Sequence, residues 1–258
     1  MVQFAANLSM MFNEVDFLDR FKAAAKAGFK GVEYLFPYDF EAKEIADKLS
    51  SNGLKQVLFN TPAGDWDAGE RGLACNPSRI DEFRDGVARA IDYAKSLECD
   101  QLHCMAGLTP DGAGAAEIRG TYVDNLRFAS AEMERAGIRC LMEMINTRDI
   151  PGFYLNMSAQ AEQIMEEVGS SNLYIQYDIY HMQIMEGDLA PTMERLLPKI
   201  AHMQLADTPG RNEPGTGEIN YPFIFAHLDA IGYKGWIGCE YKPATTTGEG
   251  LGWMKAVG

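Results

Sequence analysis

The sequence has no cluster of positive charge. It contains 23 Lys and Arg residues against 37 Asp and Glu residues, which gives a formal net charge of −14, and the basic residues form no run. A protein with this charge repels nucleic acid and anionic lipid unless a local basic patch overrides its field. We therefore expect a small-molecule substrate, with neither nucleic acid nor a membrane as a partner.

Long apolar segments and thiol motifs are also missing. No apolar run approaches the roughly 18 residues of a membrane-spanning helix. The segment from Met1 to Phe12 has no basic region and contains polar residues, so it does not resemble a signal peptide. The five cysteines are an odd number without a CxxC spacing, which is typical of free thiols in a reducing compartment. We expect a cytoplasmic protein.

The glycine-rich signatures of nucleotide-binding folds are absent as well. Gly112 and Gly114 are followed by Glu117 where a dinucleotide site needs glycine, and no GxxxxGK[ST] occurs. The sequence therefore lacks the usual glycine-rich motif of an open doubly wound sheet, which stays the alternative fold. A chain of 258 residues, 47% of them hydrophobic, suits one large domain.

Strand and helix patterns alternate along the whole chain. Strand candidates begin near Gln3, Gly31, Leu54, Asp100, Ile138, Leu173, Lys199 and Trp236. Most gaps between them carry helical periodicity, and alternating strands and helices favour a parallel sheet. Eight such units without a second compositional zone predict a single (β/α)8 TIM barrel over residues 1–258.

Several helices have clear boundary signals. We expect Asn13 to cap the first helix and Gly28 to end it, Asn76 with Pro77 to start another, and Ser158 and Gly169 to bound a third. Three loops are longer than turns require: Thr61–Asn76, Ala106–Gly114 and Ala206–Asn220. They follow strands, so they belong to the rim where barrel active sites are built.

The main functional signal is a set of oxygen-bearing side chains at the ends of the last four strand candidates. In the stretch from Leu173 to His181, the more polar face of the strand ends in Asp178. The same alternation ends the neighbouring candidates in three further residues: Glu143, Gln204 and Glu240. In a closed barrel these groups converge, and three buried carboxylates together need protons or a cation. An all-oxygen set predicts Mg²⁺ or Mn²⁺, while hydrogen-bonded polar residues filling the barrel are the alternative.

The four histidines have different expected roles. His181, in the loop after the sixth strand candidate, is expected to bind substrate oxygen or to move protons. His202 lies on the inward face of the seventh candidate but one layer deeper, so it belongs beneath the metal or in the core. His103 could face either way, and His227 is expected to be scaffold.

Long motifs carry a resemblance to a known family. They are Phe4–Phe12, Glu33–Tyr38, Pro62–Trp66, Ala68–Gly72, Gln176–Gln183, Glu213–Tyr221 and Gly238–Pro243. With these segments the chain resembles the hydroxypyruvate isomerases over essentially its whole length. Those proteins belong to the xylose-isomerase-like barrels, a group that also includes 2-oxo-tetronate isomerases, ketose 3-epimerases and an AP endonuclease.

The resemblance implies a metal centre and a reaction. It implies that Glu143, Asp178, Gln204 and Glu240 bind the metal, although epimerases of this group have histidine where this chain has Gln204. It further implies interconversion of hydroxypyruvate and tartronate semialdehyde through an enediolate, with Glu143 and Glu240 as acid and base. A 2-oxo-tetronate isomerase or a ketose 3-epimerase is the alternative, and an AP endonuclease is disfavoured by the charge. Related barrels also imply a homo-oligomer.

A hydroxypyruvate isomerase must hold a substrate carboxylate. Arg71, Arg211 and Lys242 lie in segments that follow strands, and arginine suits bidentate carboxylate binding better than lysine. Glu70 and Trp66 are expected to belong to a lid over the small substrate.

Overall fold

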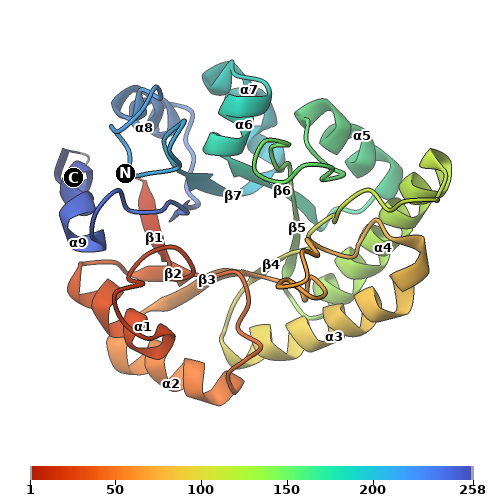
Figure 1. Ribbon diagram of the computed structural model, residues 1–258, viewed down its shortest axis with the longest axis horizontal. Coiled ribbons are helices and arrows are strands. Elements are labelled where there is room, and N and C mark those ends of the chain that lie inside the picture. Colours follow the sequence, from red (N-terminus) through yellow and green to blue (C-terminus); the bar gives the residue numbers. More distant parts are fainter. Residues whose placement is uncertain (1, 257–258) are drawn as a thin grey trace. The chain divides into compact units, whose positions relative to one another are not determined.

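The computed structural model describes residues 2–256, in which eight parallel strands form a closed barrel in chain order (Figure 1). The strands are β1 Gln3–Asn7, β2 Gly31–Glu33, β3 Lys55–Asn60, β4 Gln101–His103, β5 Arg139–Glu143, β6 Leu173–Asp178, β7 Ile200–Leu205 and β8 Trp236–Cys239. Every predicted strand start lies within one residue of the observed one. The predicted (β/α)8 fold is therefore confirmed.

Helices connect the strands, as the periodicity predicts. The α-helices are α1 Phe17–Lys26, α2 Ala42–Asn52, α3 Ile80–Ser96, α4 Ala115–Arg135, α5 Ser158–Val168, α6 Ile179–Met185, α7 Leu189–Leu196, α8 Tyr221–Ala230 and α9 Thr247–Gly250. Short 3₁₀ helices are η1 Pro77–Arg79, η2 Leu197–Lys199 and η3 Leu251–Ala256. None of the helices in residues 2–256 is long and apolar enough to cross a membrane.

The predicted cap of the first helix is wrong, whereas its end is confirmed. Helix α1 begins at Phe17, and Asp16 occupies the cap position without a side-chain hydrogen bond. Asn13 instead donates from Nδ2 to the Met10 carbonyl at 2.8 Å, so it serves the turn that precedes the helix. Gly28 has a φ of 99°, a left-handed conformation that suits glycine just after a helix.

Of the three remaining predicted helix boundaries, two are confirmed and one is displaced by one residue. Asn76 caps the η1 turn, because its side chain accepts a hydrogen bond from Ser78 N at 3.1 Å. Ser158 is the first residue of α5 and Met157 is its cap, so that prediction is displaced by one residue. Gly169 ends α5 with a φ of 66°, as predicted.

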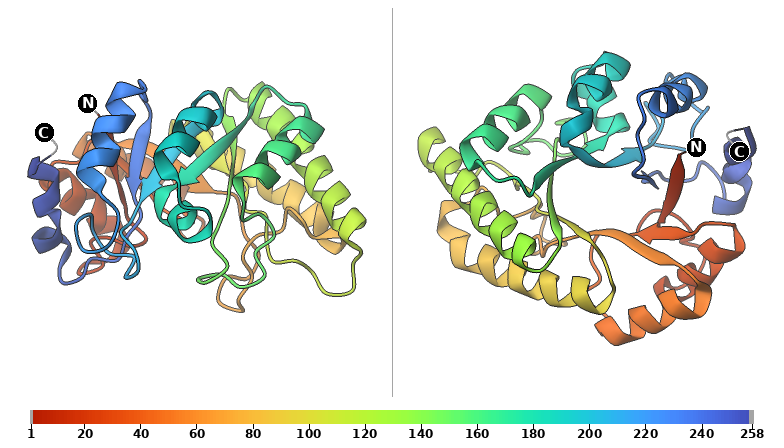
Figure 2. Two further views of the ribbon diagram at one scale, coloured as in Figure 1. Left: turned by 90° about the horizontal axis from the view of Figure 1, so that it is seen from above. Right: turned by 180° about the vertical axis from the view of Figure 1, so that it is seen from behind.

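The chain divides into two compact units, and two of the strands contribute to both. Unit 1 comprises Met1–Leu35, Lys43–Val57 and Tyr177–Gly258, and unit 2 comprises Phe36–Ala42 and Leu58–Gln176. Within unit 2, α3 and α4 pack side by side (Figures 1 and 2). That the chain forms one domain over residues 1–258 stays a prediction.

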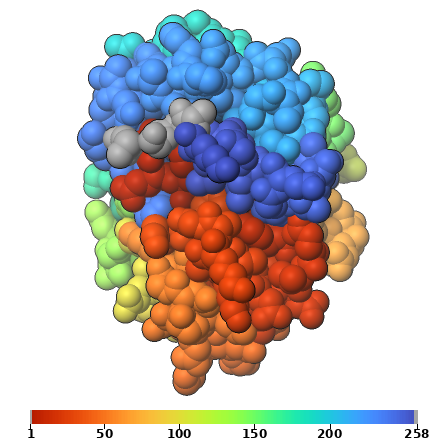
Figure 3. Space-filling model, turned by 90° about the vertical axis from the view of Figure 1, so that its left-hand side faces the viewer, coloured from red at the N-terminus to blue at the C-terminus, as the bar shows by residue number. Residues whose placement is uncertain are grey.

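The C-terminal segment of unit 1 is tied to the loop after β1. The Glu14 carboxylate accepts hydrogen bonds from the backbone N and the hydroxyl of Thr247 at 2.6 and 3.2 Å. Phe12 N donates to the same hydroxyl at 2.7 Å. Figure 3 shows the dark blue C-terminal residues lying against the red N-terminal ones. These contacts join the loop after β1 to the start of α9.

The cysteines match the sequence analysis. All five are buried and none forms a disulfide. Burial raises the pKa of the Cys75 thiol to about 12. The prediction of free thiols is confirmed.

Candidate active site

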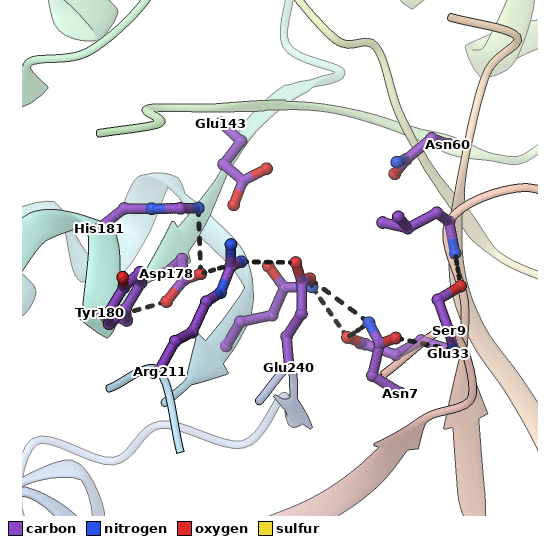
Figure 4. Close-up of polar contacts among 12 residues, drawn as sticks. Asn7, Ser9, Glu33, Asn60, Glu143, Asp178, Tyr180, His181, Arg211 and Glu240 are labelled. Carbon is purple, nitrogen blue, oxygen red and sulfur yellow. Dashed lines mark hydrogen bonds and ion pairs between the residues drawn. The ribbon is translucent and has the colours of Figure 1, made fainter. Parts of the chain in front are cut away.

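Two acidic residues of unit 1 share one guanidinium at the strand ends (Figure 4). Asp178 ends β6 with no exposed surface, and Glu240, directly after β8, is 6% exposed. Arg211 donates from Nη2 to Glu240 Oε1 at 2.9 Å, and the same nitrogen lies 3.8 Å from Asp178 Oδ2. The predicted convergence of Asp178 and Glu240 is thus present within this unit.

The loop between β7 and α8 holds Arg211 in place. Arg211 has a φ of 53°, a left-handed conformation that is uncommon outside glycine. The buried Asp207 carboxylate accepts four backbone N–H groups of this loop, those of Thr208, Gly215, Gly217 and Ile219. Backbone hydrogen bonds to an ionised group are among the stronger ones, so they define the loop that carries the guanidinium.

Gln204 connects Glu240 to a second buried carboxylate. Its Nε2 donates to Glu33 Oε1 at 2.8 Å and also to Glu240 Oε2. Asn7 Nδ2 donates to Glu33 Oε1 at 3.0 Å, and His202 Nε2 lies 2.7 Å from Glu33 Oε2. His202 has no exposed surface, in agreement with its expected place in a deeper layer.

His181 lies on a helix and not in the predicted loop. Asp178 caps α6, because its Oδ1 accepts a hydrogen bond from Tyr180 N at 2.8 Å, and the helix begins at the next residue. The strand therefore passes directly into the helix without a connecting loop. The short helix places His181 Nε2 at 3.4 Å from Asp178 Oδ2, so the two side chains lie close together.

In unit 2, Glu143 is accompanied by a histidine whose direction the sequence left open. Glu143 ends β5 and is 5% exposed. His103 Nδ1 lies 3.7 Å from Glu143 Oε2 and 3.1 Å from Asn60 Oδ1. Glu143 is in register with Gln176 of β6.

The predicted lid residues of unit 2 mainly contact one another. The Arg71 guanidinium lies 4.0 Å from the Trp66 ring centroid and donates to the carbonyls of Trp66 and Glu70 at 2.9 and 2.6 Å. Glu70 accepts from Asp65 N and pairs with Arg79. These contacts hold the loop from Thr61 to Asn76 together, and its role over a substrate stays a prediction.

Lys242, in unit 1, presents its side chain to solvent. Its backbone N donates to the Arg211 carbonyl at 2.8 Å, and its carbonyl accepts from Asn212 Nδ2 at 2.7 Å. Of the two basic residues of this unit predicted to hold a carboxylate, Arg211 lies beside the acidic pair. Lys242 contacts Arg211 through the hydrogen bond between its backbone N and the Arg211 carbonyl.

Burial changes the proton affinity of the acidic pair. It raises the pKa of Glu240 to about 8, with Asp178 and Glu33 raising it further and the Arg211 charge opposing them. Burial likewise raises the pKa of Asp178 to about 6, again against Arg211. Two neighbouring carboxylates repel each other when both are ionised, and a bound cation relieves that repulsion.

These shifts predict a pH dependence for the metal-free protein. A carboxyl group whose pKa is higher in the folded state stabilises that state below its unfolded pKa and loses this contribution as pH rises through the folded pKa. Unfolding by urea in the presence of chelator should therefore show falling stability from about pH 5 to about pH 8, the interval between the ordinary pKa and that of Glu240. Glu240→Gln should flatten this slope, and an unchanged slope would contradict the assignment.

The donor groups fit a hard divalent cation. Asp178 Oδ2 is buried and accepts no hydrogen bond from any residue in the described range 2–256. The His181 imidazole and the Arg211 guanidinium lie 3.4 and 3.8 Å from that oxygen, as ion-pair contacts and not as hydrogen bonds. A buried carboxylate oxygen without a hydrogen-bond donor has lost its contacts with water, and a bound cation would replace them.

Four polar strand-end residues, two in each unit, contact the candidate residues of their own unit, directly or through one another, and were not assigned to a site from the sequence. They are the last residues of the first four strands, Asn7, Glu33, Asn60 and His103. Each is polar and buried. The rule that singled out the last four strands, a polar residue at the strand end, would have found them too.

Known proteins are similar to this chain over nearly its whole length. The family model described as "Xylose isomerase-like TIM barrel" matches residues 21–257. The hydroxypyruvate isomerase of Escherichia coli (strain K12) is 54% identical over 254 residues, covering 98% of each chain. A 2-oxo-tetronate isomerase of Cupriavidus necator is 51% identical, covering 99% of this chain and 98% of its own.

A solved structure is similar along nearly its whole length. The crystal structure titled "AP endonuclease, family 2" from Brucella melitensis has a TM-score of 0.97 at 47% identity and covers 99% of both chains. The predicted resemblance to hydroxypyruvate isomerase is confirmed, and so is the prediction of an enzyme of the isomerase class. The chain belongs to the xylose isomerase-like TIM-barrel family.

Proposed function

We propose that this enzyme interconverts hydroxypyruvate and tartronate semialdehyde by moving a proton between adjacent carbons. The observation that carries the proposal is the buried pair of Asp178 and Glu240 with the Arg211 guanidinium between them. It offers acid–base groups and a carboxylate-binding group at one point. The hydroxypyruvate isomerase of Escherichia coli, at 54% identity, supports this choice of substrate.

We infer that the site binds Mg²⁺ or Mn²⁺. Glu143, Asp178, Gln204 and Glu240 would hold it through oxygen atoms, and His181 is a further candidate because it lies beside Asp178. A bound divalent cation would supply positive charge that stabilises the oxygen atoms of an enediolate. The fit is supported by the buried Asp178 Oδ2, which accepts no hydrogen bond from the described residues 2–256, and by the raised pKa values of the acidic pair.

Side chains of the protein would transfer the proton and bind the substrate carboxylate. Glu240, whose pKa lies near 8, can both take and return a proton around neutral pH. Glu143 is the second carboxyl group and would act on the other side of the substrate, with His103 3.7 Å from its Oε2. Arg211 would turn from Glu240 to the substrate carboxylate, a planar group that it can bind with two hydrogen bonds.

The second candidate function is 2-oxo-tetronate isomerisation. The Cupriavidus necator protein of that name is 51% identical, close to the value for the hydroxypyruvate isomerase. Both reactions use the same groups and differ in the length of the substrate. Solved structures titled L-ribulose 3-epimerase and D-allulose 3-epimerase are 21% and 19% identical, which supports the fold alone.

A substrate panel separates these functions. Protein stripped with chelator should be inactive, and Mg²⁺ or Mn²⁺ should restore turnover of hydroxypyruvate. Restored turnover only of 2-oxo-tetronates or of C5 and C6 ketoses would assign the enzyme to the alternative. Full activity in chelator, with no metal found in the protein by elemental analysis, would contradict the metal site.

An endonuclease activity is tested separately, because one similar structure is titled an AP endonuclease. The net charge of −14 opposes DNA binding, so we expect no cleavage of a duplex with an abasic site. Metal-dependent cutting in a gel assay would overturn this expectation. A homo-oligomer and a cytoplasmic location stay predictions, and sedimentation analysis tests the first.

A further inference from the structure

Glu33 is a buried carboxylate that the proposed reaction does not use. It ends β2 and is 1% exposed, yet no Lys or Arg of the described residues 2–256 pairs with it. Its partners are three side chains whose donors are amide or imidazole nitrogens, those of Asn7, His202 and Gln204. A buried carboxylate held by two amides and an imidazole, without a Lys or Arg partner among the described residues, is costly to retain. Its place at the edge of the site therefore calls for a role.

We propose that Glu33 is a positioning residue that fixes the direction of the Gln204 amide for metal binding. This inference rests on the metal site of the proposed function. An amide side chain can turn by 180° and exchange its oxygen and nitrogen, but only the oxygen can bind a cation. A carboxylate accepts hydrogen bonds and donates none, so the amide nitrogen must face Glu33 and the oxygen must point away from it.

The contacts explain why Glu33 fixes this direction better than Glu240 does. The Gln204 Nε2 atom has two hydrogens, and each of the two carboxylates accepts one of them. Glu240 is itself a proposed metal ligand, and its oxygens would be shared with the cation. Glu33 is also held by Asn7 at 3.0 Å and by His202 at 2.7 Å. Neither residue is a proposed metal ligand, so the position of Glu33 does not depend on the metal.

The Glu33 carboxylate occupies the space that a side chain at position 238 would fill. A Cβ atom at Gly238 of β8 would lie 2.2 Å from both carboxylate oxygens of Glu33. Glycine therefore leaves the space that the carboxylate occupies. Any larger residue at this position would displace the carboxylate from the Gln204 amide.

The test measures Mn²⁺ binding to chelator-stripped protein by electron paramagnetic resonance. Glu33→Gln can donate as well as accept, so it no longer selects one amide direction, and we expect Mn²⁺ affinity to fall by about 10- to 100-fold. Gln204→Ala removes the amide, and the double variant should bind Mn²⁺ as weakly as Gln204→Ala alone. The matched control is Glu213→Gln, which makes the same chemical change in a buried glutamate that accepts from Ala244 N and is not one of the proposed ligands.

Each outcome decides one question. Wild-type affinity in Glu33→Gln, or effects of Glu33→Gln and Gln204→Ala that simply add, would overturn the positioning role while the metal site stands. Failure of the wild-type protein to bind Mn²⁺ would overturn the metal site itself. Should Glu33→Gln fail to fold by circular dichroism, Gly238→Ala carries the test, because it keeps the charge and displaces the carboxylate. Unchanged Mn²⁺ affinity in that variant would overturn the positioning role.

Discussion

Replacing Glu240 by glutamine is expected to lower kcat by about 10³-fold with the fold retained, because proton transfer by a placed side chain contributes roughly 10²- to 10⁴-fold. Glutamine has nearly the same shape but cannot take up or release a proton at neutral pH. The buried position and the pKa near 8 make Glu240 the group in unit 1 that is best suited to do so. Steady-state turnover of hydroxypyruvate with saturating Mn²⁺ measures the effect.

Glu213→Gln provides the matched control for this substitution. It makes the same chemical change in a buried residue of the loop after β7, where the glutamine oxygen can still accept from Ala244 N. We expect its kcat to stay near the wild-type value. A Glu240→Gln protein that turns over at the wild-type rate would remove Glu240 from the mechanism, whatever its effect on metal affinity.

The strand periodicity explains why the fold and part of the site could be predicted. Side chains alternate along a strand, so an oxygen-bearing residue that ends the more polar face of a strand is expected to point toward the barrel axis. Asp178, Gln204 and Glu240 were predicted by this rule and lie together in unit 1. The rule uses only local spacing, which a single sequence displays directly.

Long-range contacts explain what the sequence could not show. Glu33 and Gln204 are far apart in the chain, and nothing local indicates that their side chains meet at 2.8 Å. The assignment of His181 to a loop was wrong because Asp178 serves twice, as the end of a strand and as the cap of a helix. A sequence pattern assigns one role to each residue, whereas this carboxylate has two.

The three basic residues predicted to hold the substrate carboxylate can be ranked by substitution. Arg211→Ala is expected to lower kcat/KM for hydroxypyruvate by about 100-fold, mainly through a higher KM, since removing one partner of a buried charge pair costs roughly 2 to 5 kcal/mol. Arg211 is 16% exposed and lies against Glu240, where a small substrate can reach it. Lys242→Ala should have little effect, because its side chain is exposed to solvent.

Metal binding and rescue separate this role from a structural one. Arg211 opposes the raised pKa values of Asp178 and Glu240, so its loss removes a competing cation and Mn²⁺ affinity should not fall. Added guanidinium ion should restore part of kcat/KM in Arg211→Ala if the lost interaction is with the substrate carboxylate. An unchanged KM in that variant, with a large increase in Arg71→Ala, would transfer the carboxylate site to the loop of unit 2. That loop already holds its guanidinium over Trp66, and the substrate would then have to compete with the ring.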